Sequence, residues 1–291
     1  MNRLRRLSDP ASLSNLLAGA HGSLVAVSFL SGGRTYSALV PSAELWISVK
    51  DILVFEGYEM LDGFRLGHLG RDALVVDAGA NVGLYSLKAA PLVSRVLAIE
   101  PSAANRELLT RNLVANGVEN VETRASALWY TKETLGMVEA GSSSHVTRGR
   151  GDLQVPTLAL DELVSECGRV DLLKMDVEGA ELEILLGSEL PTLRRIDRLV
   201  AEVHLYEASR REQFLKLIER LRKADMKVSI FSGPVQGLGD IIAKPVTCPL
   251  KKCNGRSAPL YRAFISSSYL YRKLSAGRKN EPVLLLYAYR N

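Results

Sequence analysis

Residues 75–83 read VVDAGANVG, an apolar run that meets one acidic residue and then a loop containing two glycines. This order predicts a buried strand that passes through a tight turn into the start of a helix. Gly79 lets a ligand approach the backbone, Gly83 lets the helix sit close to the strand, and Asn81 tolerates a positive φ. The Asp77 carboxylate points into the same turn and suits a cationic or amino group. The GxGxxG spacing of a dinucleotide loop is absent, which argues against NAD.

The next apolar run, RVLAI, is followed by Glu100, which lies about 20 residues beyond Asp77. An acidic residue at this spacing accepts both ribose hydroxyls of an adenosine cofactor. Its negative charge also disfavours a 2′-phosphate, so NADP is not expected. The sequence therefore predicts an adenosine-type site with an unphosphorylated ribose.

Two later apolar runs also stop at polar side chains. LLKMDVEGAE places Asp176 and Glu178 after one run, and AEVH places Glu202 and His204 at the end of another. Ligands bind at the carboxyl ends of the strands in open α/β sheets, so we expect these four side chains to converge with the glycine loop.

From Leu74 onward, apolar runs, turns and amphipathic stretches alternate, which predicts parallel strands with crossover helices. The fold class is therefore α/β, a doubly wound, mostly parallel sheet of seven strands. The expected strands are 73–76, 95–99, 121–125, 170–175, 199–203, 227–231 and 282–289. The expected helices are 82–90, 104–116, 158–166, 180–186 and 210–224.

The domain organisation has two further parts. Residues 1–68 form an N-terminal α+β appendage, with a hairpin of strands 23–30 and 34–40 and a short strand and helix over 46–58, placed to cap the cleft. Residues 69–291 form the main domain, and 233–280 is an insertion before its last strand. That stretch is too long for a hairpin loop, so it is a substrate-binding insertion or a flap.

Composition sets outer bounds on function. No apolar run approaches the roughly 18 residues of a membrane-spanning helix, and three cysteines are too few for a disulfide framework, so we expect a cytoplasmic protein. Cys248 and Cys253 are interpreted as loop thiols, with metal binding as the minority alternative. The net charge of +5 includes a basic, aromatic segment at 251–279, which is either an RNA-binding surface or a solvated face.

The motifs VVDAGANVG, IEP, LLKMDVEGAELEIL and AEVH, together with VPTLALDEL at 155–163, resemble the FkbM family of class I methyltransferases. The resemblance covers residues 74–204 and implies a Rossmann-like fold, use of S-adenosyl-L-methionine and methylation of a hydroxyl on a sugar, glycan or other small molecule. It also implies cofactor contacts: Asp77, Gly79, Asn81 and Gly83 at the methionine part, Glu100 at the ribose, and Ser126 near the adenine.

Methylating an alcohol requires alignment and removal of a proton, because a hydroxyl is a weak nucleophile. His204 is the most economical base, since an ordinary imidazole titrates near neutrality. Asp176 and Glu178 orient the acceptor or, with Glu202 and His204, bind a divalent metal, which is possible but not expected because nothing in the spacing demands it. In the alternatives with a purely structural role, Glu178 caps the following helix and His204 is only the last residue of a strand.

Two other functions stay open. One is an RNA methyltransferase acting on tRNA or rRNA through segment 251–279, and the other is a noncatalytic module that binds an adenosine cofactor. The fourth parallel strand ends in DVEG and lacks an Asn-Pro-Pro-Tyr-like sequence, which disfavours methylation of an exocyclic amine. His21, His68 and His145 lie in segments without a clear pattern and receive no role.

Overall fold

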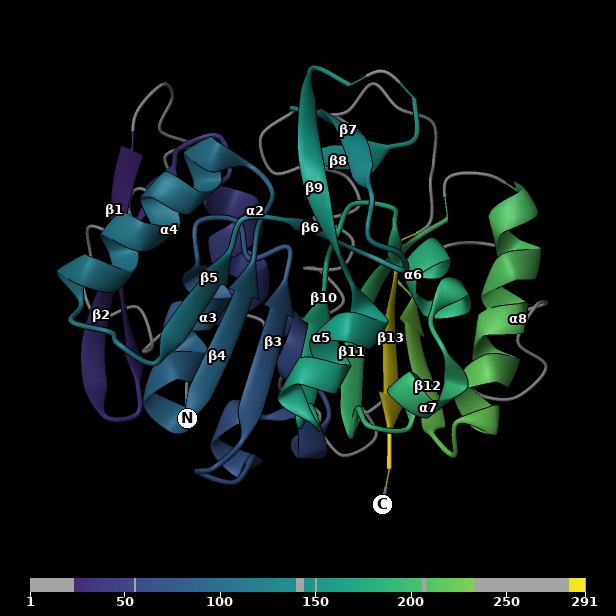
Figure 1. The fold of residues 1–291 in the computed structure, drawn as a ribbon. Coiled ribbons are helices and arrows are strands. Elements are labelled where there is room, and N and C mark those ends of the chain that lie inside the picture. Colours follow the sequence, from purple (N-terminus) through teal and green to yellow (C-terminus); the bar gives the residue numbers. More distant parts are fainter. Residues whose placement is uncertain are drawn as a thin grey trace.

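The computed structural model describes residues 24–54, 56–139, 144–149, 151–205, 208–232 and 283–290. Its centre is a seven-stranded sheet in the order β12-β13-β11-β10-β3-β4-β5 (Figure 1). Every pairing is parallel except the two that β13 makes. The strands are β3 (Leu74–Ala78), β4 (Arg95–Ile99), β5 (Val121–Arg124), β10 (Leu172–Met175), β11 (Arg198–His204), β12 (Lys227–Ser232) and β13 (Val283–Tyr289). The predicted doubly wound α/β sheet is confirmed.

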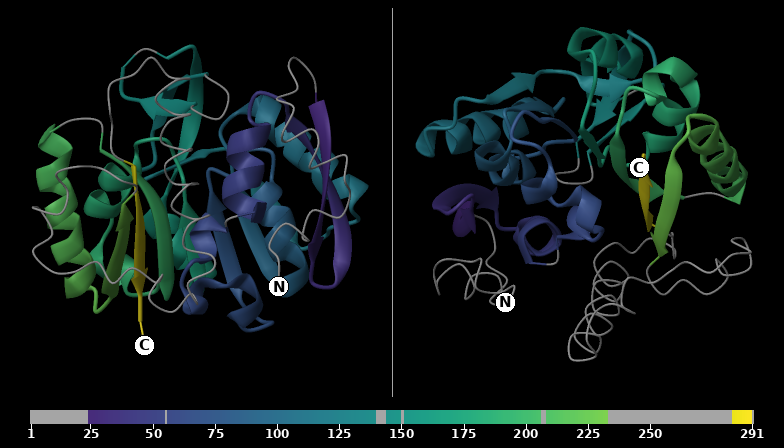
Figure 2. Two further views of the ribbon diagram at one scale, coloured as in Figure 1. Left: turned by 180° about the vertical axis from the view of Figure 1, so that it is seen from behind. Right: turned by 90° about the horizontal axis from the view of Figure 1, so that it is seen from below.

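Helices cover both faces of this sheet (Figure 2). Helices α5–α8 share a core with one face, whereas α3, α4 and the N-terminal segments pack on the other. The helices are α3 (Leu84–Ala89), α4 (Ala103–Ala115), α5 (Leu160–Cys167), α6 (Glu181–Gly187), α7 (Leu190–Leu193) and α8 (Ala208–Lys223). The short α7 was not predicted, but the other five match the expected helices to within a few residues at each end.

The register of the strands decides which polar side chains meet. Lys174 of β10 lies beside Asp77 of β3 on one side and beside Val200 of β11 on the other. Because side chains alternate along a strand, the face that buries Leu172 and Val200 also presents Lys174 and then Glu202 toward the carboxyl ends. The same face is therefore apolar in its middle and charged at the edge where a ligand would bind.

The N-terminal region begins with the antiparallel hairpin of β1 (Leu24–Ser31) and β2 (Arg34–Pro41), as predicted. It packs against α3 and α4 (Figure 1). The strand expected within 46–58 is wrong: α2 (Leu45–Val49), a π-helical turn (Lys50–Val54) and a 3₁₀ turn (Gly57–Glu59) form there. Leu45, Val49 and Leu53 recur every four residues and are all buried, which is helical spacing. The domain division at residue 68 stays a prediction.

A four-stranded sheet that the sequence analysis missed lies between β5 and α5. It consists of β6 (Ala127–Trp129), β7 (Thr134–Val138), β8 (His145–Thr147) and β9 (Leu153–Ala159), in the order β6-β9-β7-β8. Figure 1 shows this β-insertion above the carboxyl ends of the central strands. Strand β9 includes the first two residues of the helix expected over 158–166, so that helix begins at Leu160.

Several predictions fall outside the described residues: the whole insertion at 233–280, the pair Cys248 and Cys253, the segment 251–279, and His21. Within the described ranges, none of the helices combines the length and apolar character that crossing a bilayer requires.

Candidate functional site

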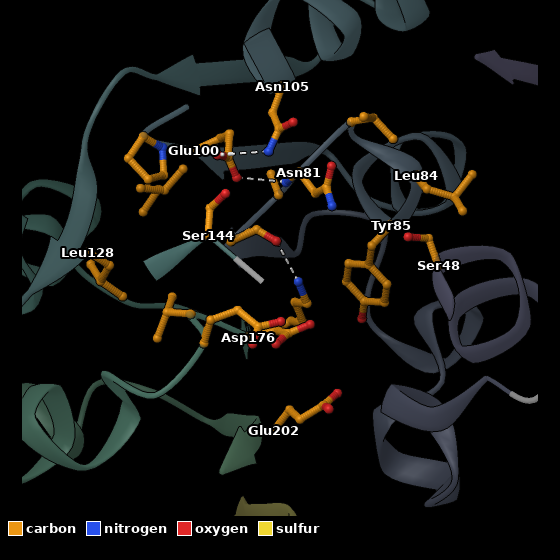
Figure 3. A pocket seen from close by; sticks show the side chains of 18 of the residues that line it. Ser48, Asn81, Leu84, Tyr85, Glu100, Asn105, Leu128, Ser144, Asp176 and Glu202 are labelled. Carbon is orange, nitrogen blue, oxygen red and sulfur yellow. Dashed lines mark hydrogen bonds between the residues drawn. The ribbon is translucent and has the colours of Figure 1, made fainter. Parts of the chain in front are cut away.

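A pocket of about 1060 Å³, part of it open to solvent, lies at the carboxyl ends of β3, β4, β10 and β11 (Figure 3). The chain order in the sheet reverses between β3 and β10, which is where open α/β sheets bind ligands. The lining comes from the glycine loop, the strand ends, the N-terminal helical segment and the β-insertion. The lining residues include Tyr58, Gly79, Asn81, Tyr85, Ile99, Glu100, Asn105, Ala127, Leu128, Ser144, His145, Lys174, Asp176, Glu178 and Glu202.

The glycine loop is held against the loop that follows β10. Gly79 has a φ of +73°, and a Cβ built there would lie 1.8 Å from the carbonyl oxygen of Asp176. The Asp176 amide in turn donates to the Ala78 carbonyl at 3.0 Å. Asn81 takes the positive φ that the sequence predicted, at +49°. Gly83 does not line the pocket; a Cβ there would meet Leu109 of α4 at 2.8 Å, so its close neighbour is a helix and not the strand.

Glu100 lies beside this loop with both carboxylate oxygens engaged. Oε2 accepts from the Asn81 amide at 2.9 Å, and Oε1 accepts from the Ser102 amide at 2.9 Å and from Asn105 Nδ2 at 3.3 Å. Burial raises the pKa of Glu100, although these hydrogen bonds oppose the shift. Oε2 accepts one hydrogen bond and has a second lone pair, so the carboxylate can still accept a hydroxyl from a ligand.

Asp77 is fully buried and does not line the pocket. Ser86 Oγ donates to its Oδ2 at 2.7 Å, and Lys174 Nζ lies 3.1 Å from its Oδ1. Lys174 also donates to the Gly79 carbonyl at 2.8 Å and does line the pocket. Burial lowers the pKa of Lys174, but Asp77 and Asp176 outweigh it and raise the value. The cation beside Asp77 is thus supplied by the chain itself, and a contact between Asp77 and a ligand stays a prediction.

The other end of the pocket is acidic. The Tyr58 hydroxyl lies between two carboxylates, 2.8 Å from Asp176 Oδ2 and 3.2 Å from Glu202 Oε2, and its single hydrogen is shared between them. Burial and these carboxylates raise the pKa of Tyr58 well above its ordinary value, so the hydroxyl keeps its proton. The remaining oxygen of Asp176, Oδ1, is shielded from solvent and accepts no hydrogen bond from any described residue. The predicted convergence of Asp176, Glu178 and Glu202 at this edge is present.

His204 is buried behind this acidic end and does not line the pocket. Its Nδ1 lies 3.1 Å from Glu181 Oε1, and its Nε2 lies 3.5 Å from Glu178 Oε2. Burial lowers the pKa of His204, but Glu181 and Glu178 overcome that effect and raise it to about 10. An ordinary imidazole titrates near neutrality, but here two carboxylates stabilise the imidazolium and shift the pKa upward. A role for His204 as the base stays a prediction.

The structure does not support the alternative in which the Glu178 side chain caps α6. Glu181 holds the turn before that helix, since its Oε1 accepts from the Val177 amide at 3.3 Å and the Gly179 amide at 3.0 Å. Glu178 has a positive φ of 53° and lines the pocket. Burial and Asp176 raise the pKa of Glu178 to about 8.

Several lining residues were missed from the sequence. Tyr85 is 1% exposed, and its hydroxyl makes no hydrogen bond with any described residue although it lines the pocket (Figure 3). A buried donor without a partner is typical of a site that a ligand completes. His145, which received no role, lies in β8 and lines the pocket, whereas Ser126 does not; its neighbours Ala127 and Leu128 do. His68 forms part of an exposed 3₁₀ turn.

Three curated proteins are similar in sequence to this chain, and two of them are named as methyltransferases. The chain is 29% identical over 178 residues to AMB antimetabolite synthetase AmbE of Pseudomonas aeruginosa, 27% over 161 residues to Methyltransferase 1 of Beauveria bassiana, and 28% over 179 residues to Methyltransferase sdnD of Sordaria araneosa. These matches cover 46%, 45% and 48% of this chain and 8%, 65% and 69% of the relatives.

Solved structures with similar folds include methyltransferase FkbM from Methylobacillus flagellatus, with 18% identity, 78% and 53% coverage of the two chains and a TM-score of 0.40. Another is the SAM-dependent methyltransferase from Agrobacterium tumefaciens, with 11% identity, 93% and 71% coverage and a TM-score of 0.46. The model of the methyltransferase FkbM domain matches residues 77–228, more than half of the chain. The chain therefore belongs to the FkbM methyltransferase family.

Proposed function

We propose that this protein transfers a methyl group from S-adenosyl-L-methionine to a hydroxyl of a sugar, glycan or other small molecule. The observation that carries the proposal is the pairing of two ends in one pocket. A nucleoside-type cradle at Gly79, Asn81 and Glu100 is continuous with an acidic end at Asp176 and Glu202. The first suits an adenosine cofactor, and the second suits an acceptor that donates a hydrogen bond and then a proton.

The residues of the cradle fit the cofactor. Glu100 would accept the ribose hydroxyls, while Ile99, Ala127 and Leu128 offer an apolar wall for the adenine ring. The Tyr85 hydroxyl is a buried donor that a bound ligand would satisfy. When bound, S-adenosyl-L-methionine supplies an electrophilic methyl group on a sulfonium centre.

The acidic end would position the acceptor. Asp176 Oδ1 is a buried acceptor without a partner among the described residues, so an acceptor hydroxyl can donate to it. Tyr58 fixes this carboxylate through its other oxygen. As the acceptor oxygen receives the methyl group from the sulfonium, which would leave as a neutral thioether, a carboxylate of this end would take the hydroxyl proton; Glu178 also lines the pocket here. Alignment of the acceptor oxygen with the methyl carbon is the larger contribution expected from the protein.

The proposal is tested with methyl-labelled S-adenosyl-L-methionine and the purified full chain. We expect calorimetry to show one cofactor bound per chain, and we expect label from a cell extract to enter small molecules or glycans as a methyl ether. Absence of cofactor binding would overturn the proposal. Label in RNA would favour the RNA methyltransferase, which rests on the segment at 251–279, and binding without any transfer would favour the noncatalytic module.

Glu100→Gln is expected to weaken cofactor binding about 10- to 100-fold, because hydrogen bonds to a charged acceptor contribute about 1.5–3 kcal/mol. Ionised Glu100 binds the hydroxyls best, so affinity in the wild type should be lost as the pH falls through its pKa. Burial raises that pKa, so the loss begins at a higher pH than for an ordinary glutamate. Calorimetry as a function of pH measures both effects.

The matched control is Glu107→Gln, which alters an exposed glutamate of α4 and should leave the affinity unchanged. The Glu100→Gln variant should also lose the pH dependence at the acidic end. Equal affinities of Glu100→Gln and the wild type at neutral pH would remove Glu100 from the cofactor site.

A further inference from the structure

Three ligand atoms of the kinds that bind metals lie together at the acidic end of the pocket. One atom each from Asp176, Glu202 and His204 can be chosen so that all three lie within 4.8 Å of one another. They follow β10 and end β11, the two adjacent strands whose carboxyl ends border the pocket. Two carboxylates and an imidazole are a mixed oxygen and nitrogen donor set.

The orientation of His204 is already fixed by a second carboxylate. Glu181 is fully buried and is itself held by the Val177 and Gly179 amides, and its Oε1 lies 3.1 Å from His204 Nδ1. This contact favours a hydrogen on Nδ1, so the ion would bind at Nε2, which lies 3.5 Å from Glu178 Oε2 and would release its proton when the ion binds. Histidine ligands of metals commonly donate their other nitrogen to a carboxylate in this way, which orients the ring.

Asp176 and Glu202 are held together by Tyr58. The Tyr58 hydroxyl bridges Asp176 Oδ2 and Glu202 Oε2, so two carboxylates that would otherwise repel one another stay adjacent. Asp176 Oδ1 is shielded from solvent and has no hydrogen-bond partner among the described residues. A buried carboxylate oxygen without a partner is unfavourable unless a ligand or ion completes it.

Four carboxyl groups lie near one another at this end in the described part of the chain: Asp176, Glu178, Glu181 and Glu202. His204 contacts Glu178 and Glu181, and Lys174 is paired with Asp77 at 3.1 Å. Carboxyl groups this close to one another are unfavourable as anions unless protons or cations lie between them. A divalent cation would supply such a positive charge.

We infer that Asp176, Glu202 and His204 form a binding site for a divalent transition cation at the acceptor end of the pocket. The imidazole donor favours a first-row transition cation over Mg²⁺ or Ca²⁺, which prefer oxygen alone, and the two carboxylates are donors that also suit Mn²⁺. Three protein ligands leave positions open toward the pocket. The inference rests on the proposed function. With the ion bound, the acceptor hydroxyl would contact the ion instead of Asp176, and the ion would lower the pKa of that hydroxyl.

The probe is Mn²⁺ added to the full chain after chelation and dialysis, with free Mn²⁺ followed by electron paramagnetic resonance and no cofactor present. We expect one saturable site per chain. Glu202→Gln and His204→Gln should each weaken it more than about 100-fold, because even partners outside the ligand set change affinity about 10- to 100-fold. Glu183→Gln, which alters the carboxylate of α6 that pairs with Arg210, should bind as the wild type does.

A second measurement uses the wild type alone, so it stands even where a variant fails to fold. Bound Mn²⁺ should broaden the NMR signals of the His204 ring at concentrations that leave the exposed His68 ring sharp. Absence of saturable binding, equal affinity in folded variants, or equal broadening of both rings would each overturn the inference. S-adenosyl-L-methionine binding measured in chelator separates the two proposals: a chain that binds the cofactor but no Mn²⁺ keeps the proposed function and loses the metal site.

Discussion

Gly79→Ala should abolish cofactor binding and lower the free energy of unfolding by about 3 kcal/mol or more. The added Cβ would lie 1.8 Å from the Asp176 carbonyl oxygen, which belongs to the backbone and cannot rotate away. Relief requires the loops after β3 and β10 to separate, which breaks the hydrogen bond from the Asp176 amide to the Ala78 carbonyl. The positive φ of 73° adds strain for any residue with a Cβ.

The measurement is chemical denaturation together with calorimetry against S-adenosyl-L-methionine. Gly168→Ala is the matched control, because Gly168 has a φ of +75° but no atom within 4 Å of the position a Cβ would take. That variant should lose only the strain energy, about 1 kcal/mol, and should bind the cofactor normally. If the two variants lose the same stability, the contact between the loops contributes nothing beyond the backbone conformation.

Lys174→Met should lower the free energy of unfolding by about 3–5 kcal/mol, the usual effect of removing one partner from a buried ion pair. Methionine retains most of the side-chain volume but no charge, and it would leave fully buried Asp77 without a cationic partner among the described residues. The substitution also removes the hydrogen bond from Nζ to the Gly79 carbonyl, so the glycine loop should loosen and cofactor affinity should fall.

Denaturation of the double variant Asp77→Asn/Lys174→Met identifies the cause. Replacing both charges by neutral groups should recover much of the lost stability, since the penalty comes from an uncompensated charge. Lys216→Met, which breaks the exposed pair with Glu212, should leave stability unchanged. A double variant no more stable than Lys174→Met would show that the packing of the lysine stem, and not its charge, is what matters.

The fold was largely predictable because its strands are continuous apolar runs that end at turns, as in VVDAGANVG and LLKMDVEG. The β-insertion was not, because two of its strands, β6 and β8, lack an alternating pattern. Ala127–Trp129 is buried at every position and His145–Thr147 is half-buried at every position, and both strands are three residues long. Such segments carry too little periodicity to distinguish a strand from a loop.

The candidate site was predictable where backbone conformation limits the residue type, as at Gly79 and Asn81. It was less predictable where distant segments meet. Tyr58 lies 118 residues from Asp176 in sequence and belongs to a turn without a motif. Lys174 was visible as a lone charge in an apolar run, but its partner depends on a strand register that the sequence does not reveal. The pKa of His204 likewise depends on where Glu181 lies.

The position of β13 has a consequence for the order in which the sheet can assemble. Strand β13 lies between β11 and β12 and is the only strand with which β12 pairs in the described part of the chain. Residues 233–282 separate β12 from β13 in sequence, so the two strands pair only after chain positions far apart come together, which is entropically unfavourable and slow. Until residues 283–289 pair with it, β11 has an unpaired edge, and this side of the sheet cannot be completed before the last described strand is in place.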